Sequence, residues 1–272
     1  MLKLLDAPKI PMFVRERGRF YDFPTKKLKQ LVHTDEKKGN ISLIKDSYYL
    51  SRIKIPLTKI LKQRYGSDTV PSSRIAIFRD LKDLTIDDQR FSRLPSSFHK
   101  LKQLNVLSLR NNEFQDFPSE LAGLSNLRHL NLSGNSFQDF PSELAGLSNL
   151  RHLDMSKNKI HTISPQINMT DIDQLESLNL STNSLETLPE SIENLSKLTY
   201  LNLTQNELRN LPESFANLMQ LKALSLSFNH FSDVPPSLNH LDNLQALYLI
   251  GNDINEEEYG RWRKKRKNLS VF

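Results

Sequence analysis

The sequence predicts an α/β repeat solenoid, in which short parallel strands stack side by side and helical turns lie on the outer side. Three observations predict it. Leucine recurs at fixed positions in eight consecutive segments, an asparagine closes nearly every segment, and consecutive asparagines lie 23 residues apart in every step but one, which is 25. Repetition at this period is typical of proteins that stack one structural unit.

Each segment begins with the pattern Leu-x-x-Leu-x-Leu-x-x-Asn. Its alternation with a period of two predicts a short strand whose leucines point to one side. The amide of the closing residue can donate and accept hydrogen bonds, so we expect it to satisfy buried backbone groups of its own and the neighbouring copy. The predicted ladder consists of Gln89 in a degenerate first copy and Asn112, Asn135, Asn158, Asn183, Asn206, Asn229 and Asn252 in the others.

The second half of each segment reads apolar-Pro-x-x-apolar-x-x-Leu, as in Leu94-Pro95-Phe98-Leu101. A leading proline and a spacing of three favour a short helical or 3₁₀ turn. Since narrow strands lie on one side of the stack and wider turns on the other, the stack must curve, with the strands on its concave face.

Seven full matches in register over residues 75–254 make the chain resemble the leucine-rich-repeat family in its 23-residue form. The resemblance implies a scaffold that binds another protein. The chain is also similar to leucine-rich-repeat effectors secreted by intracellular bacterial pathogens, because the acidic block Glu256–Glu258 resembles part of their type IV secretion signals. That likeness implies a host protein as the partner. Residues 113–135 and 136–158 match at 19 of 23 positions, which indicates the duplication of one unit.

Three regions are expected: a basic, α-rich N-terminal region (1–74), a repeat domain (75–254) and a C-terminal cap (255–272). In the first, Pro24–His33 and Pro56–Tyr65 have helical spacing, and Ile41–Ile55 favours strand or extended chain. We expect this region to shield the apolar edge of the first repeat.

The C-terminal segment predicts a capping helix followed by a strand. Asn255 is a good N-cap, and Tyr259 and Trp262 share one helix face that can cover the last repeat. The basic run 264–267 also resembles a nuclear-import signal, which is a second interpretation of the same segment.

Charge is unevenly distributed along the chain. Residues 1–74 hold 17 Lys/Arg and 7 Asp/Glu, residues 75–255 hold 14 and 21, and the last 17 residues hold 6 and 3. This asymmetry supports an alternative function, an adaptor that attaches to anionic membrane or nucleic acid through its basic N-terminal region and tail.

The composition also limits function and location. Cysteine is absent, which excludes disulfides, thiolate zinc sites and cysteine nucleophiles. No apolar run reaches the roughly 18 residues of a membrane span, and the N-terminal apolar stretch is too short for a Sec signal. We therefore expect a cytoplasmic monomer, or a protein delivered into a host cell by another route.

Three outward positions in each of the eight copies supply 24 residues for a contact surface, which is enough for a standard protein interface. Tyr200, Phe228, Tyr248 and Ile250 are the expected anchors, because aromatic residues supply most interface energy; the alternative is that they cover the edge of the last copies. The other predicted partner-binding residues are Asp83, Asp87, Val106, Arg110, His129, His152, Asp154 and Asn202.

A chemical interpretation of this face is less favoured. His129, His152 and Asp154 could bind a metal, but the two histidines occupy the same position in duplicated units, so their proximity needs no metal. The chain has no glycine-rich phosphate loop, no HExxH string and no Ser-His-Asp order. We therefore expect no bound cofactor, no metal site and no enzymatic activity.

Overall fold

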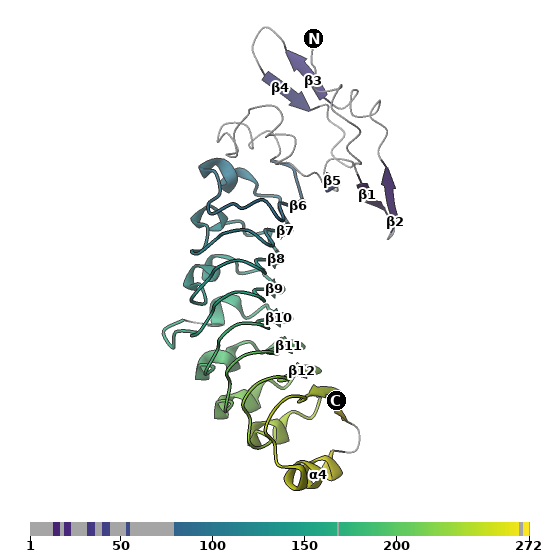
Figure 1. Cartoon of the computed structure of the whole chain (residues 1–272). Helices are drawn as coiled ribbons and strands as arrows, with labels where there is room; N and C mark the ends of the chain where they lie inside the picture. The colour runs from purple at the N-terminus through teal and green to yellow at the C-terminus, as the bar shows by residue number, and fades with distance from the viewer. Residues whose placement is uncertain are drawn as a thin grey trace.

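The computed structural model describes residues 79–167, 169–266 and 269–271, together with short strands at 13–16, 19–22, 32–35, 40–43 and 53–54. In the described part of the chain, nine parallel strands form one open, curved sheet in the order β14 to β6 (Figure 1). The strands are β6 (Asp83–Thr85), β7 (Val106–Ser108), β8 (His129–Asn131), β9 (His152–Asp154), β10 (Ser177–Asn179), β11 (Tyr200–Asn202), β12 (Ala223–Ser225), β13 (Ala246–Tyr248) and β14 (Ser270–Val271).

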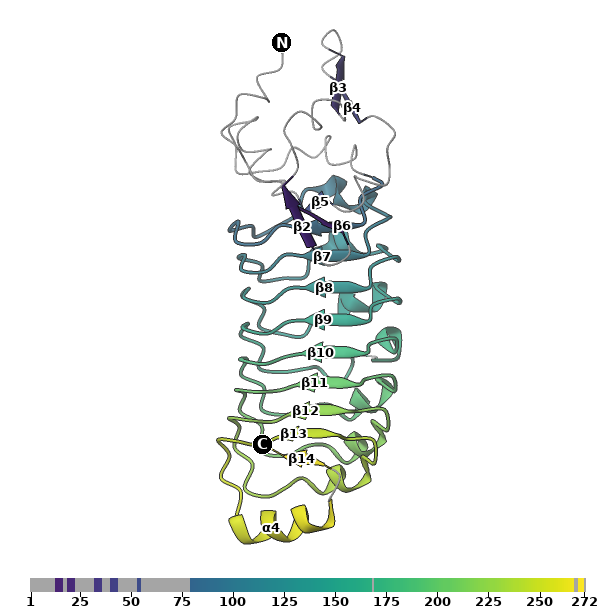
Figure 2. The ribbon, with the colours of Figure 1, turned by 90° about the vertical axis from the view of Figure 1, so that its right-hand side faces the viewer.

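The repeat strands pair without a slip in register. In β8 and β9, for example, His129 lies opposite His152, Leu130 opposite Leu153 and Asn131 opposite Asp154. The central leucine of each strand is buried and its two neighbours are at least partly exposed. The predicted alternation is therefore confirmed. One face of the sheet is open from β8 to β13, whereas β2 lies in front of β6 and β7 (Figure 2).

Short 3₁₀ helices lie on the side away from the strands (Figure 1). A proline immediately precedes all of them except η6, and its fixed φ suits the start of such a turn. The predicted solenoid class is thus confirmed. The turns are η3 (Ser96–Lys100), η4 (Ser119–Leu121), η5 (Ser142–Gly146), η6 (Met169–Ile172), η7 (Glu190–Asn194), η8 (Glu213–Asn217) and η9 (Pro236–His240).

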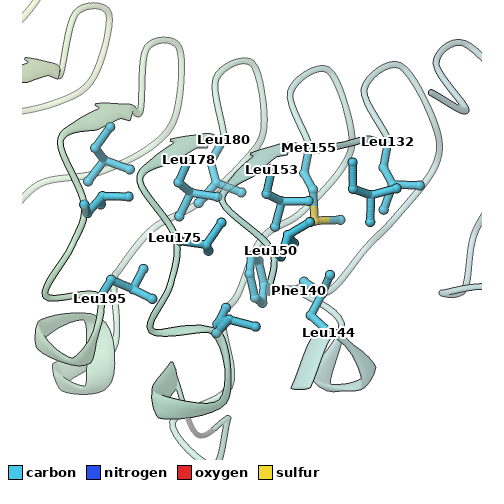
Figure 3. Packing of buried hydrophobic residues seen from close by; sticks show 14 of the residues in the cluster. Leu132, Phe140, Leu144, Leu150, Leu153, Met155, Leu175, Leu178, Leu180 and Leu195 are labelled. Carbon is cyan, nitrogen blue, oxygen red and sulfur yellow. The ribbon is translucent and has the colours of Figure 1, made fainter. Parts of the chain in front are cut away.

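A single hydrophobic core runs between strands and turns through the whole array. Leu153 and Leu178 from the strands, and Met155 just after β9, pack in the same core as Leu144 of η5 and Phe140 just before it (Figure 3). Since each repeat leaves part of its apolar surface to its neighbours, the array folds as a stack and not as separate units.

The closing asparagines hold neighbouring repeats together. Asn206 is 4% exposed, its Nδ2 donates to the carbonyls of Leu180 and Leu203, both at 3.0 Å, and its Oδ1 accepts from the Leu185 amide at 3.0 Å. Six more asparagines, from Asn112 to Asn252, make the same kind of contacts.

Gln89 lies at the first ladder position but does not repeat this geometry. Its side chain is exposed, and its Nε2 donates only to the carbonyls of Asp87 and Asp88 in its own repeat. The described ladder that joins one repeat to the next therefore begins at Asn112.

The array ends in a helix and a strand. Helix α4 (Glu256–Lys265) follows Asn255, whose Oδ1 accepts from the Glu257 amide at 3.0 Å, and β14 pairs in parallel with β13. Tyr259 and Trp262 are partly buried against the core, as the spacing on one helix face predicts.

Arg266 joins this segment to the last repeats. Its Nη2 donates to the carbonyls of Leu238 at 2.5 Å and Leu241 at 3.0 Å, and Nη1 lies 3.5 Å from Asp242. Its side chain is only 18% exposed, so this member of the basic run is engaged in holding the fold.

The N-terminal region contains short antiparallel strands among its described residues. β1 (Phe13–Glu16) pairs with β2 (Arg19–Asp22) and β5 (Ile53–Lys54), and β3 (Val32–Asp35) pairs with β4 (Asn40–Leu43). β5 and all of β4 except Asn40 fall in the segment Ile41–Ile55, which was expected to be strand or extended.

The helix predicted over Pro24–His33 is wrong at its end, because Val32 and His33 begin β3. Cross-strand pairing of the β-branched Val32 and Thr34 with β4 overrides the local helical spacing there. The rest of that prediction, and the helix over Pro56–Tyr65, lie outside the described residues. No helix in the described part of the chain is long and apolar enough to span a membrane.

Candidate protein-interaction surface

Figure 2 looks onto the open face of the sheet, which we call the concave face. On each repeat strand the two residues that flank the central leucine are turned toward this face, and across the strands they form two rows. Adjacent strands lie about 4.8 Å apart, so side chains within a row are close neighbours. The first row is Asp83, Val106, His129, His152, Ser177, Tyr200, Ala223 and Ala246; the second is Thr85, Ser108, Asn131, Asp154, Asn179, Asn202, Ser225 and Tyr248.

A third row of outward residues was predicted just after each strand, and this prediction is wrong for three copies. Ser133, Ser156 and Ser227 are only 5–7% exposed. The Ser133 hydroxyl donates to Asn131 Oδ1 at 2.6 Å and the Ser156 hydroxyl to Asp154 Oδ1 at 2.7 Å, so these short side chains close the turn after the strand. The concave face is therefore narrower at β8, β9 and β12, whereas the third-row residues Ser181 and Thr204 after β10 and β11 are partly exposed.

The N-terminal end of the face is internally paired. The Asp87 carboxylate accepts from the Ser108 hydroxyl at 2.5 Å and the Arg110 amide at 3.0 Å, and the Arg110 guanidinium lies 4.0 Å from it. Arg110 also lies 3.9 Å from Asp88. The structure thus brings two predicted contact residues, Asp87 and Arg110, into contact with each other.

The middle of the face holds a stacked pair of histidines. The rings of His129 and His152 have centroids 4.3 Å apart and an interplanar angle of 6°. Burial and the neighbouring His152, Arg128 and Arg151 lower the pKa of His129, and Glu176 opposes them. His129 is therefore held in its neutral form at neutral pH.

The predicted polar residues beside this pair stabilise the backbone. Asp154 Oδ1 accepts from both the amide and the hydroxyl of Ser156, at 2.9 and 2.7 Å, and Asn202 Oδ1 accepts from the Thr204 amide at 3.0 Å. Within the described residues, no three His, Cys, Asp or Glu side chains are placed to hold a metal ion.

The C-terminal end of the face is apolar and exposed. Tyr200 is 40% exposed, Phe228 53%, Tyr248 39% and Ile250 58%. We call these four residues the aromatic patch. The small side chains of Ala223, Ser225 and Ala246 lie between the two tyrosines in the rows of the sheet.

Phe228 is a bulky residue at a position where every copy has a left-handed backbone, from Asp88 in the first copy to Gly251 in the last. Its φ is +56°, in the left-handed region that a bulky residue rarely adopts, and the next copy has Gly251 at the same position, with φ +73°. The Phe228 ring lies against that glycine, since a Cβ built on Gly251 would lie 2.4 Å from Phe228 Cδ1. Only glycine leaves room for the ring in this place.

Arg128, which directly precedes His129, was not among the predicted contact residues. Among the described residues it forms no ion pair, whereas the equivalent Arg151 binds Glu176 at 2.6 Å. The duplicated string, which contains Arg-His at the same position of both copies, was the available signal.

Known families and structures match this architecture. Leucine-rich-repeat family models match residues 79–137 and 167–208, a two-copy model matches 125–168, and a single-repeat model matches 220–241. No relative among curated protein sequences matches the chain.

Among solved structures, the chain is similar to a leucine-rich-repeat protein of Leptospira interrogans, with 29% identity and a TM-score of 0.62 over 75% of this chain and 57% of that one. It is similar to the ectodomain of the plant receptor kinase GASSHO1/SCHENGEN3 of Arabidopsis thaliana, solved with CASPARIAN STRIP INTEGRITY FACTOR 2, with 28% identity and a TM-score of 0.57 over 67% and 22%. It also shares its fold with internalin C2 of Listeria monocytogenes, with 24% identity and a TM-score of 0.62 over 75% and 86%. The chain belongs to the leucine-rich-repeat family.

Proposed function

We propose that this chain is a non-enzymatic module that binds a partner protein on its concave face and anchors it on the aromatic patch. Leucine-rich-repeat domains generally mediate protein–protein interaction. The observation that carries the proposal is the placement of exposed apolar side chains. Of the five large hydrophobic residues that are exposed in the described part of the chain, four form the aromatic patch.

The chemistry of the patch favours a partner. Burying a Tyr or Phe side chain in an interface supplies much of its binding energy. The outward positions of β11, β12 and β13 carry no charged side chain. An apolar surface that docks here would therefore desolvate no charged side chain of these strands. We expect the part of the partner that contacts them to be uncharged.

The backbone of Phe228 supports the same function. A bulky residue in the left-handed region costs about 1–3 kcal/mol and is commonly retained where function needs it. Most other copies have a polar residue or glycine at this position, such as Asn111, Gln205 and Gly251. The ring packs on Gly251 of the next copy and still leaves 53% of Phe228 exposed, where a partner can reach it.

The test replaces Tyr200 and Tyr248 with alanine. Because each anchor contributes about 2 kcal/mol or more, the double variant should bind a partner captured by the native chain roughly 1,000-fold more weakly. The melting temperature should stay nearly unchanged, since both side chains are 39–40% exposed.

Met219→Ala is the matched control. Met219 is 49% exposed and lies in the loop between η8 and β12, outside the aromatic patch. It should leave the affinity unchanged. Equal binding by the native chain and the Tyr200/Tyr248 double variant would contradict the proposal.

More specifically, we propose that the chain is a bacterial effector and that its partner is a host protein. It is supported by the 29% identity to the Leptospira protein and by the duplicated repeats. The chain spans 57% of the length of that protein. Affinity capture from a host-cell lysate and from a bacterial lysate tests it; a partner found only in the bacterial lysate would contradict it.

The three-region division, with residues 1–74 as a separate basic region, is part of the proposal. The excess of Lys and Arg in that region supports the alternative, attachment to anionic membrane or nucleic acid. Full chain and residues 75–272 should be compared with anionic vesicles and RNA at 50 mM salt. Absence of binding by the full chain would dispose of the alternative.

A further inference from the structure

A small pocket opens on the turn side of the array, away from the concave face. It lies between η5 and the segment that leads into η6, and its volume is about 200 Å³. Most of its wall is apolar, since Phe140, Leu144 and Ile172 are buried there and Ile167 is partly buried. We call it the turn pocket.

The turn pocket lies in the one copy that is longer than the others. The step from Asn158 to Asn183 is 25 residues, whereas the other steps are 23. The turn proline of this copy is Pro165, but η6 begins only at Met169, while in the other copies the 3₁₀ helix follows its proline directly. The longer connection lines the pocket on one side and η5 lines it on the other.

The size of the turn pocket indicates what it can hold. Sites for small-molecule ligands usually have volumes of about 300–1,000 Å³, so this pocket is small for a metabolite or a cofactor. An apolar cavity of about 150 Å³ holds one benzene molecule. The turn pocket therefore has room for a single apolar side chain about the size of a phenyl ring.

Two carboxylates lie at the mouth of the turn pocket. Asp171 lines it and is exposed. Glu143 on η5 lies beside it, because its Oε2 accepts from the hydroxyl of the lining residue Ser142 at 3.4 Å. None of the ion pairs among the described residues involves either acid, and no Lys, Arg or His lines the pocket.

The negative charge extends over the neighbouring turns. Each of η4, η5, η6, η7 and η8 contains at least one Asp or Glu and no Lys, Arg or His. Two basic groups beside these turns have partners of their own, since Lys102 donates to the Gly123 carbonyl at 2.9 Å and His161 lies 3.9 Å from Asp139. A surface with charge of this sign attracts a basic ligand and repels an acidic one.

We propose that the turn pocket is a docking site for a basic segment of a partner protein. One apolar side chain of that segment, about the size of phenylalanine, enters the pocket and covers its apolar wall. A Lys or Arg beside it in the segment lies against Asp171 and Glu143 at the mouth. This site is separate from the concave face, so it goes beyond the proposed function and does not depend on the aromatic patch.

Ala145 allows the turn pocket to be filled without a change to the core. It lines the pocket from η5 and is exposed, and the same position in other copies holds His99, Glu193 and Asn239. A larger side chain is therefore compatible with the fold, and Ala145→Leu should fill the pocket. Ala122→Leu is the matched control, because Ala122 is exposed at the same position of the duplicated copy and does not line the pocket.

The experiment titrates the full chain with the peptide acetyl-Lys-Phe-Lys-amide, whose phenyl ring carries a fluorine label that is followed by fluorine NMR. We expect saturable binding that Ala145→Leu weakens roughly tenfold or more and Ala122→Leu leaves unchanged. Asp171→Asn should weaken binding about threefold, because it removes one exposed charge from the mouth. The acidic peptide acetyl-Glu-Phe-Glu-amide should bind roughly tenfold more weakly than the basic one.

Four outcomes overturn the inference: no saturable binding of the basic peptide, native-like binding by Ala145→Leu, equal weakening by Ala145→Leu and Ala122→Leu, or equal affinity for the basic and the acidic peptide. The Tyr200/Tyr248 double variant should bind the basic peptide as the native chain does. Loss of binding in that variant would assign the peptide to the aromatic patch and would also overturn the inference.

Discussion

Asn206→Ala tests how the repeats are joined. The substitution removes three buried hydrogen bonds, those to the carbonyls of Leu180 and Leu203 and from the amide of Leu185. Each contributes about 1 kcal/mol net, and the backbone groups left buried without a partner add to this. We expect the free energy of unfolding to fall by about 3–5 kcal/mol.

The same substitution at two other ladder positions gives a graded series. Asn252 makes equivalent bonds to Leu226 and Leu249, but it is only partly buried, so water can replace them. Asn252→Ala should cost about half as much. Gln89→Ala should cost less than about 0.5 kcal/mol, because the Gln89 side chain is exposed and contacts only its own repeat.

Urea unfolding followed by circular dichroism measures the series. The order of unfolding midpoints should be Gln89→Ala near the native chain, then Asn252→Ala, then Asn206→Ala, with similar slopes if the array unfolds cooperatively. A cost below 1 kcal/mol for Asn206→Ala, or equal midpoints for all three variants, would refute the role given to the ladder.

Three further predictions concern other sites. Gly251→Ala should lower the free energy of unfolding by about 1–2 kcal/mol, because residue 251 has a positive φ and the new Cβ would meet the Phe228 ring. Adding Phe228→Ala to the same chain should recover part of the lost stability. An unchanged stability of the Gly251→Ala variant would contradict the contact. Arg266→Met should cost about 2–3 kcal/mol, measured by urea unfolding, since two carbonyls lose a charge-assisted donor; an unchanged midpoint would mean that the bonds contribute nothing. The lowered pKa of His129 means that the unfolded chain binds more protons below the ordinary histidine pKa, so stability should fall as the pH drops from 7.5 to 5.5; His129→Gln should flatten this dependence, and an identical slope in both chains would contradict it.

The fold could be predicted closely because its rules are local and repeated. Alternating leucines specify strands, the leading prolines specify turns, and a constant step between asparagines specifies a register without slips. The same is true of the capping helix, whose N-cap residue Asn255 is readable from sequence. The N-terminal region lacks such repetition, and there the spacing over Pro24–His33 gave way to strand pairing at Val32 and His33.

The candidate surface could be predicted only in outline. The sequence places Tyr200, Tyr248 and the histidine pair on one face, because that follows from register alone. It does not show that Ser133 folds its hydroxyl back onto Asn131, or that Phe228 adopts a left-handed backbone. Both features recur at the same position of several copies, but they depend on torsion angles and side-chain rotamers that the alternation of leucines does not specify.

The duplicated unit has a consequence for how this surface can change. Each added copy of 23 residues would insert one strand between its neighbours and leave the pairing rules of both ends intact. The separation between sites on different strands is therefore a whole number of steps of about 4.8 Å. Duplication of one unit therefore changes the distance between two contact sites by one such step. The array can fit a new partner in this way while the residues of both contacts stay the same.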